Sequence, residues 1–183
     1  MKVEATSLPG VIIVSPKRWS DHRGYFVEVF NQKTLSDFGI DMSVVQENQS
    51  FSTTAGTVRG LHFQTPPHPQ AKLIRVLSGR IFDVAIDIRA GSPTYRKWVA
   101  VELTALGGEQ LFIPAGFAHG FCTLEPNTEV SYLVDAVYTP QCDRAILWND
   151  PDLGIAWPDI AGALVSEKDE QAPRLAAIPP PFL

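Results

Sequence analysis

His62 is a candidate for acid–base chemistry, because an imidazole titrates near neutral pH and can remove a proton. It stands three residues after Arg59 in the segment 57–64, where apolar residues flank both side chains. In a strictly extended chain these two side chains would face opposite sides. Gly60 can break that alternation and bring both to one pocket, because glycine adopts backbone angles that other residues avoid. The segment fits a catalytic histidine and a hydrogen-bonded core histidine equally well.

Tyr132 places a hydroxyl group on the apolar face of an expected strand. Its neighbours on that face are Val130 and Val134, so its phenol is expected to point into the interior. A buried tyrosine hydroxyl needs a hydrogen-bond partner. By this pattern alone Tyr132 is typical of a packing residue.

The charged run at 166–169 is typical of solvated surface.

Lys72 and the segment that ends at His119 are similar to the two signatures of cupin barrels. Residues 108–119 give glycine, five residues, proline, one residue, glycine, two residues and histidine. Lys72 and Gly79 have the spacing of the acid and the glycine in the first signature, with lysine in place of the acid. Metal-binding cupins need histidines and a carboxylate around one cation, which an ammonium group repels. Even with His68 as a further ligand, the sequence predicts no metal site and a pocket that prefers an anion; a structural histidine at a turn is the alternative for His119.

The overall composition excludes several classes of function. The 183 residues are 45% hydrophobic and 19% charged, which is typical of a globular domain. The net charge of −5 argues against a general nucleic-acid binder, although a local basic pocket remains compatible with it. Cys122 and Cys142 cannot form a zinc site alone. No apolar run reaches membrane-helix length and the first residues lack a signal-peptide core, so we expect a cytoplasmic protein.

Short strands dominate the predicted structure, because 15 prolines and 13 glycines interrupt the chain at close spacing. In residues 80–88 the even positions from 82 to 88 are apolar, whereas Asp83 and Asp87 occupy odd positions, which predicts a strand with one buried face. A helix is expected at 31–38, with Asn31 as its N-cap and Gly39 after its end. A second short helix is expected at 169–175, and a surface tail from residue 178. The expected strands are 11–14, 24–30, 72–77, 80–88, 97–103, 110–113, 129–134 and 145–148. Together they predict one all-β domain over residues 1–183, a cupin-type jelly-roll barrel with short flanking helices.

Six motifs in fixed order make the chain resemble the dTDP-4-dehydrorhamnose 3,5-epimerase family. The resemblance extends from about residue 8 to about residue 175. The motifs are Arg59-Gly-Leu-His62-Phe-Gln64, Lys72-Leu-Ile-Arg-Val, Asp83-Val-Ala-Ile-Asp-Ile-Arg89, Ser92-Pro-Thr-Tyr-Arg-Lys-Trp98, Ile113-Pro-Ala-Gly-Phe-Ala-His-Gly-Phe121 and Trp148-Asn-Asp-Pro151. The resemblance implies an isomerase without cofactor or metal, which forms a homodimer with strand exchange. The implied substrate is a dTDP-linked 4-keto-6-deoxyhexose on the way to dTDP-L-rhamnose, with no nucleic acid or membrane as a partner.

The resemblance also implies a role for each matching residue. His62 would remove the protons at C3 and C5, Asp169 would hydrogen-bond its imidazole, and Tyr132 would return a proton from the opposite face. Inversion next to a ketone passes through an enolate, and Lys72 is the natural cation to stabilise its oxygen. The remaining matches imply substrate contacts: Arg23 and Arg59 to the pyrophosphate, Tyr138 on the thymine, and Glu28, Gln46, Asn48, His119, Asp143 and Lys168 elsewhere on the substrate.

Three departures from the family pattern keep alternatives open. Leu133 follows the tyrosine where lysine is common, the segment 46–50 has glutamine where histidine is usual, and Asp143 replaces a glutamate. One alternative is an epimerase that inverts only C3 or C5 of a related nucleotide sugar. From other classes, a metal-dependent cupin enzyme or a non-catalytic sugar-nucleotide binding module is possible.

Overall fold

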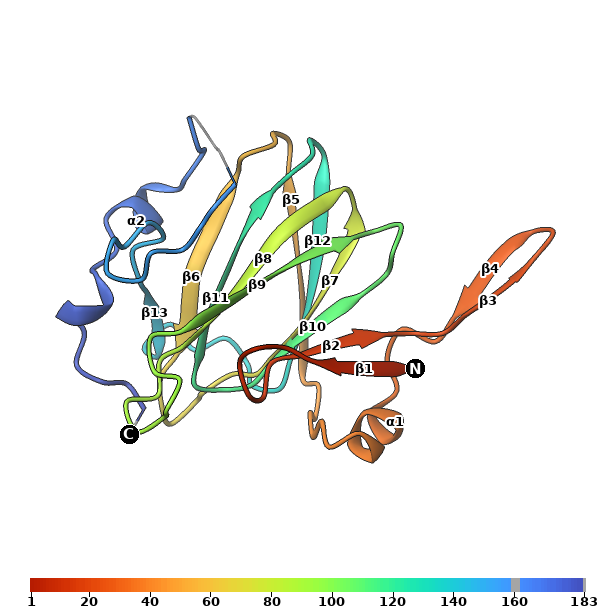
Figure 1. The fold of residues 1–183 in the computed structure, drawn as a ribbon, viewed down its shortest axis with the longest axis horizontal. Helices are drawn as coiled ribbons and strands as arrows, with labels where there is room; N and C mark the ends of the chain where they lie inside the picture. Colours follow the sequence, from red (N-terminus) through yellow and green to blue (C-terminus); the bar gives the residue numbers. More distant parts are fainter. Residues whose placement is uncertain (159–161, 183) are drawn as a thin grey trace.

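Two antiparallel sheets face each other and form a barrel in the computed structural model, which describes residues 1–158 and 162–182 (Figure 1). The strands are β1 (Lys2–Ala5), β2 (Ile12–Ser15), β3 (Arg18–Asp21), β4 (Gly24–Val27), β5 (Gln46–Ser52), β6 (Val58–Gln64), β7 (Lys72–Ser78), β8 (Arg80–Asp87), β9 (Trp98–Thr104), β10 (Gln110–Ile113), β11 (Phe117–Thr123), β12 (Thr128–Val134) and β13 (Asp143–Ala145). The helical elements are α1 (Gln32–Asp37), α2 (Glu167–Glu170) and the 3-10 turn η1 (Leu175–Ala177). The predicted all-β class is confirmed. Of the described helices, none has the length and apolar character needed to cross a membrane.

The order of strands in the two sheets brings distant segments together. One sheet has the order β1-β2-β10-β7-β12-β5, and the other has the order β13-β6-β11-β8-β9. His119 on β11 lies directly opposite His62 on β6, so both side chains project to the same side of that sheet. In the facing sheet, Tyr132 on β12 lies opposite Asn48 on β5. The barrel therefore collects the predicted site residues from strands far apart in the sequence.

Strand β8 has the predicted alternation, but the prediction that only one of its faces is buried is wrong, because both faces are buried. Val84 and Ile86 pack outside the barrel against Leu175 and other residues of the C-terminal segment. Asp83 and Asp87 on the other face are both fully buried, with 0% exposure. The C-terminal segment covers the outer face of the sheet, and a local pattern of apolar residues carries no information about such a distant contact.

The helices agree with the prediction at one end of the chain and differ at the other. Asn31 caps α1, since its side chain accepts a hydrogen bond from the Thr34 backbone, and Gly39 follows with a φ of 79°. The helix expected at 169–175 is wrong: α2 begins at Glu167, capped by Ser166, and ends before η1. The tail is also not free surface, because residues 178 and 182 pack against the outer face of the five-stranded sheet. The strands β1, β3, β5, β6 and β11 lie outside the expected runs.

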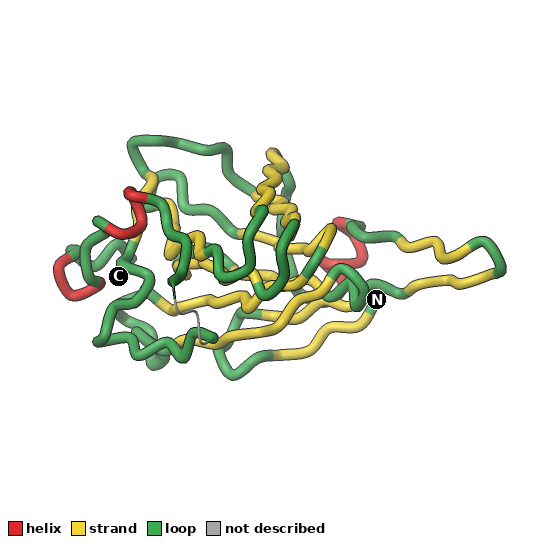
Figure 2. Tube along the Cα trace, turned by 90° about the horizontal axis from the view of Figure 1, so that it is seen from above, coloured by secondary structure: helices red, strands yellow, loops and turns green. Residues whose placement is uncertain are grey.

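The hairpin of β3 and β4 projects away from the barrel as a long arm (Figures 1 and 2). Trp19, Tyr25 and Phe26 on this arm are at least half exposed. Its base is tied to the barrel by Arg18, whose guanidinium donates to the Ala105 carbonyl oxygen at 3.2 Å. The arm thus presents aromatic side chains that the barrel of its own chain does not cover.

Candidate active site

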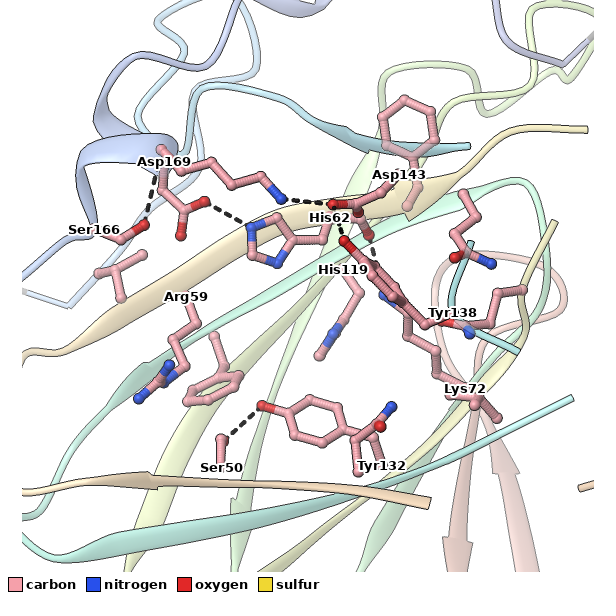
Figure 3. Close-up of a pocket in the computed structure, with 18 of the residues that line it drawn as sticks. Ser50, Arg59, His62, Lys72, His119, Tyr132, Tyr138, Asp143, Ser166 and Asp169 are labelled. Carbon is pink, nitrogen blue, oxygen red and sulfur yellow. Dashed lines mark hydrogen bonds and ion pairs between the residues drawn. The ribbon is translucent and has the colours of Figure 1, made fainter. Parts of the chain in front are cut away.

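One cavity of about 610 Å³ opens between the two sheets, a size typical of small-molecule sites. Its walls come from β5, β6, β7, β11, β12 and the segment around α2 (Figure 3). His62 and Tyr132 line the same space, as an acid and a base on opposite sides of one sugar ring would require. The candidate residues in the lining are Asn48, Arg59, His62, Lys72, His119, Tyr132, Tyr138, Asp143, Lys168 and Asp169.

His62 and Asp169 form a hydrogen-bonded pair, with Nε2 and Oδ1 2.7 Å apart. The Asp169 carboxylate is almost fully buried, and its other oxygen accepts from the Gly60 backbone N–H at 3.3 Å. Burial raises the pKa of Asp169, but the hydrogen bond to His62 and its other contacts lower it further, so the pKa lies below its usual value. The ionised carboxylate fixes the orientation and tautomer of the imidazole, because the ring nitrogen that faces it must carry a hydrogen. The run at 166–169 is therefore not simple solvated surface, contrary to its local pattern.

A second histidine–aspartate pair faces the same cavity, and sequence reasoning did not assign its carboxylate. Nε2 of His119 lies 2.5 Å from Oδ1 of Asp83, and both side chains are buried. Burial lowers the pKa of His119, and the negative charge of Asp83 opposes that effect only in part. The signal that could have found Asp83 is that it shares the odd-numbered face of β8 with two apolar residues, Ile81 and Ala85, which pack in the interior.

Lys72 carries a positive charge at the position where the first cupin signature has a metal-binding acid. Its Nζ donates to the His62 carbonyl oxygen at 3.1 Å. Burial lowers the pKa of Lys72 to about 8, while the charges of Asp143 and Asp83 act in the opposite direction. Within residues 1–158 and 162–182, no three histidine, cysteine or acidic side chains are grouped to hold a metal ion. The cavity thus holds an ammonium group next to the backbone of its proposed base.

The phenol of Tyr132 lies across the cavity from His62 (Figure 3). Its oxygen is 2.9 Å from Oγ of Ser50 on the edge strand β5. The ring packs near His119 and Phe121, with centroids 6.2 and 6.3 Å away. Burial raises the pKa of Tyr132, so the phenol keeps its proton at neutral pH. A protonated phenol facing the cavity can serve as an acid.

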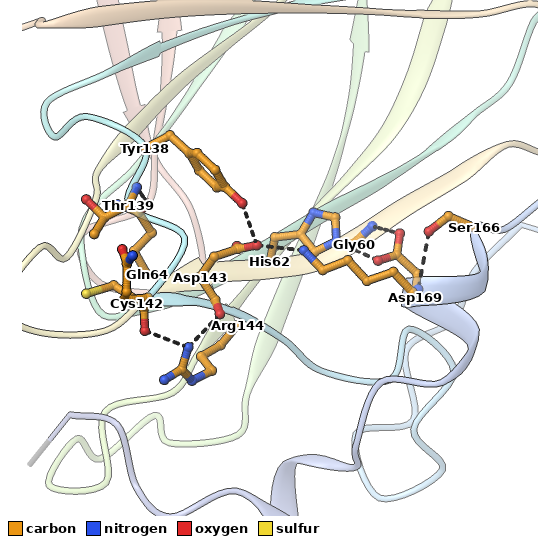
Figure 4. A network of polar contacts seen from close by, with 12 residues as sticks. Gly60, His62, Gln64, Tyr138, Thr139, Cys142, Asp143, Arg144, Ser166 and Asp169 are labelled. Atoms are coloured by element: carbon orange, nitrogen blue, oxygen red, sulfur yellow. Dashed lines mark hydrogen bonds and ion pairs between the residues drawn. The ribbon is translucent and has the colours of Figure 1, made fainter.

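The mouth of the cavity carries the groups suited to a charged and aromatic ligand. Arg59 is oriented by a hydrogen bond from its guanidinium to the Phe51 carbonyl oxygen, at 3.0 Å. Asp143 accepts from Lys168 Nζ at 2.6 Å and from the Tyr138 hydroxyl at 3.3 Å, and Figure 4 shows Tyr138 pointing toward it. The hydrogen bond between Lys168 and Asp143 raises the pKa of Lys168. The lysine therefore stays charged at the cavity entrance.

Three predicted contact residues do not line the cavity formed by their own described chain. Arg23 lies at the tip of the β3–β4 arm, where it pairs with Asp21 at 2.6 Å, and Glu28 directly follows β4. Gln46 stands just outside the cavity, and its Oε1 accepts from the Tyr138 backbone N–H at 3.0 Å. The structure thus separates the arm residues from the barrel residues with which the resemblance groups them.

Comparison with known proteins gives the same assignment as the motifs. The sequence model described as dTDP-4-dehydrorhamnose 3,5-epimerase matches residues 5–177. A Sinorhizobium fredii protein of that name is 47% identical over 182 residues, covering 100% of this chain and 93% of the relative.

Solved structures are similar over nearly the whole chain. The dTDP-6-deoxy-D-glucose-3,5-epimerase from Legionella pneumophila, in complex with dTDP-4-keto-L-rhamnose, has a TM-score of 0.94 and 38% identity, covering 100% of this chain and 98% of its own. A 3'-monoepimerase from Streptomyces bikiniensis, in complex with dTDP-quinovose, has a TM-score of 0.86 and 37% identity, covering 93% and 86%. On the family match and the identity to its relatives, the chain belongs to the dTDP-4-dehydrorhamnose 3,5-epimerase family of isomerases.

Proposed function

We propose that this protein converts dTDP-4-dehydro-6-deoxy-D-glucose into dTDP-4-dehydro-L-rhamnose by inverting C3 and C5 of the sugar. The observation that carries the proposal is the single cavity lined by His62, Tyr132 and Lys72. The substrate class comes from the Sinorhizobium fredii and Legionella pneumophila relatives, whose names give this activity or a dTDP-linked keto sugar. The reaction needs no redox cofactor, because epimerisation beside a ketone moves only protons.

The proposed reaction proceeds at each carbon in two proton transfers. Nε2 of His62 is bonded to Asp169, so the other ring nitrogen, Nδ1, takes the proton from the carbon beside the ketone. The electron pair of the broken C–H bond forms the enolate, whose oxygen at C4 gains a negative charge that the Lys72 ammonium stabilises. The Tyr132 phenol then gives its proton to the opposite face of the same carbon. Return of a proton from His62 to solvent, and of one from solvent to Tyr132, completes a cycle with no net change.

Tyr132→Phe tests the acid separately from the base. We expect about 10²-fold slower formation of the inverted product, because the ring remains but its acidic hydrogen is gone. Removal of the sugar protons by His62 should continue, so exchange with solvent deuterium should exceed product formation. NMR of the substrate in deuterated water measures both. Ser131→Ala is a suitable control, since Ser131 on the same strand bonds Glu47 on the other face. Equal losses of exchange and inversion would exclude the phenol as a dedicated acid.

The nucleotide is proposed to lie at the cavity mouth. Arg59 supplies a guanidinium for the pyrophosphate, since guanidinium groups bind phosphates through paired hydrogen bonds. Tyr138, 55% exposed in this structure, offers a ring face for the thymine. We propose further substrate contacts from Asn48, His119, Asp143, Lys168 and Gln46. An anionic ligand at these groups is consistent with an acidic protein whose cavity is lined by Arg59, Lys72 and Lys168.

We also propose that the protein is a homodimer in which the β3–β4 arm of each subunit reaches the partner's cavity. The support is the exposed aromatic surface of the arm, together with the distance of Arg23 and Glu28 from their own cavity. Exposed aromatic clusters commonly mark protein–protein contacts. In such a dimer Arg23 would add a positive charge to the pyrophosphate site, and Glu28 would contact the substrate.

Subunit complementation tests this shared site. We expect His62→Ala subunits, coexpressed with subunits carrying Arg23→Ala and Phe26→Ala, to form mixed dimers with one intact site each. Random pairing leaves about a quarter of all sites intact, and in the purified mixed dimers about half of the sites are intact. Activity of mixed dimers, purified by two different tags, is the measurement. His62→Ala paired with Tyr132→Phe is the matched control, because both changes lie in the same cavity and neither subunit complements the other. Equal activity of the two pairings would refute the exchange of arms.

The proposed function is tested by incubating the protein with dTDP-4-dehydro-6-deoxy-D-glucose in deuterated water and following C3 and C5 by NMR. Deuterium at both carbons and formation of the L-sugar are expected. Deuterium at one carbon alone would instead support a single-carbon epimerase, which the similarity to the Streptomyces bikiniensis monoepimerase keeps as the second candidate. Binding without turnover would indicate a binding module, and turnover that depends on a stoichiometric bound metal would indicate a metal-dependent cupin enzyme.

A further inference from the structure

Two fully buried carboxylates on strand β8 differ sharply in their surroundings. Asp87 accepts hydrogen bonds from the Arg89 backbone (3.0 Å) and guanidinium (2.8 and 2.9 Å), from Ser92 Oγ (2.5 Å) and from Thr94 Oγ1 (2.6 Å). Asp83 has one partner, His119, at 2.5 Å. Its second oxygen, Oδ2, has no hydrogen-bond partner among the residues that the structure describes.

This difference separates a stabilising carboxylate from a costly one. A buried charge is tolerated when hydrogen bonds and an opposite charge replace the lost water, as they do for Asp87. A buried carboxylate oxygen without a partner keeps much of its desolvation penalty. Asp83 has the nearby charge of Lys72 but only one hydrogen bond, against five for Asp87, so it stabilises the fold less than Asp87 does. A buried charge with so few partners is a candidate for a role in function.

The place of Asp83 indicates which group it serves. It lies on the interior face of β8, in register with Phe121 on β11, two residues from His119. His119 lines the cavity, and Figure 3 shows it between His62 and Tyr132. Nε2 of His119 is hydrogen-bonded to Asp83. The other ring nitrogen, Nδ1, is not fully buried and makes no hydrogen bond within the described chain. Asp83 thus holds the far side of a ring whose near side is open to the substrate.

We infer that Asp83 is a positioning residue, which keeps the neutral His119 ring protonated at Nε2 so that Nδ1 accepts a hydrogen bond from a sugar hydroxyl group. The inference rests on the proposed function and adds a residue and a tautomer to it. A neutral ring suits this place, because burial already lowers the pKa of His119 and His62 beside it gains a proton during the reaction. Without the carboxylate, the ring could rotate or take the other tautomer, which presents an N–H group where the substrate needs an acceptor.

Asp83→Asn and Asp87→Asn form a matched pair of variants on one strand. For Asp83→Asn we expect a melting temperature equal to or above that of the unchanged protein, with kcat/KM lower by about 10- to 100-fold, as for other residues that orient a functional histidine. For Asp87→Asn we expect the reverse, a lower melting temperature with kcat/KM nearly unchanged. Asp83→Asn with unchanged kcat/KM, or with a loss of stability like that of Asp87→Asn, would overturn the inference.

A double-mutant cycle with His119→Asn shows whether Asp83 acts through His119. We expect Asp83→Asn to lower kcat/KM less than twofold when His119 is already replaced, because the ring that it positions is gone. Additive losses would contradict the inference. The tautomer is measured directly by ¹⁵N NMR of the unchanged protein labelled at histidine, where a hydrogen on Nδ1 of His119 would also overturn it. This spectrum needs no turnover, so it distinguishes failure of the inference from failure of the proposed function.

Discussion

His62→Ala is expected to abolish deuterium exchange at both C3 and C5, with turnover lower by about 10³- to 10⁴-fold, the upper range for loss of a general base. The reason is that one imidazole serves both carbons in the proposed reaction. Asp169 holds the orientation and tautomer of that imidazole, and the two side chains are 2.7 Å apart. NMR in deuterated water counts exchange at each carbon separately.

His68→Ala is the control for this variant, since His68 is an exposed histidine in the turn after the same strand. It should leave exchange at both carbons unchanged. Asp169→Asn should fall between the two, because the imidazole remains but loses the carboxylate that fixes its orientation and tautomer. Persistent washout of either proton in His62→Ala would disprove a shared base and would require a separate base for that carbon.

Lys72→Met is expected to lower kcat by about 10²- to 10³-fold, comparable to the loss of one group that stabilises an oxyanion. Methionine keeps much of the length and apolar stem of lysine but carries no charge to place beside the enolate oxygen. Burial holds the pKa of Lys72 near 8, below its usual value, so the ammonium group is present below that pH and lost above it. The kcat/KM of the unchanged protein should therefore fall as pH rises through about 8, and this alkaline limb should be missing in the variant.

The stability of Lys72→Met provides an independent check. A buried ammonium group disfavours folding while it is charged, so the variant should melt at or above the temperature of the unchanged protein at pH 7. Lys33→Met serves as the control, because Lys33 is exposed on α1, where it pairs with Asp37 at 2.9 Å. If Lys72→Met kept full kcat, the enolate charge would have to be stabilised by another group.

The fold was predictable where a local pattern matches a local cause. Asn31 and Gly39 delimit α1 as their capping chemistry predicts, and the alternation in residues 80–88 identifies β8. The same alternation failed to predict how β8 is covered, because Val84 and Ile86 are buried by Leu175 and its neighbours, far along the chain. Contacts of that kind depend on tertiary structure, and the one-sided interpretation of β8 was wrong for this reason.

The site was predictable mainly through the family resemblance. Locally, His62 fitted a core histidine and Asp169 fitted solvated surface, yet they pair across 107 positions of sequence. Tyr132 pointed inward as its valine neighbours indicated, and it packs against the interior cluster that contains Val130. Asp83 was missed because an acidic residue between apolar ones was assigned to an exposed face. Only the facing strands show that this face is the interior.

The pairing of His62 with Asp169 connects the barrel interior to a segment outside the barrel, residues 162–182, which we call the strap. The strap is held by its own contacts, such as the Asp150 carboxylate accepting from the Leu175 backbone at 2.8 Å. Peripheral segments open with a smaller free energy than a whole domain. Detachment of the strap would leave the two sheets assembled while the imidazole loses its counter-charge. We therefore expect thermal inactivation to be a local event that precedes melting of the barrel.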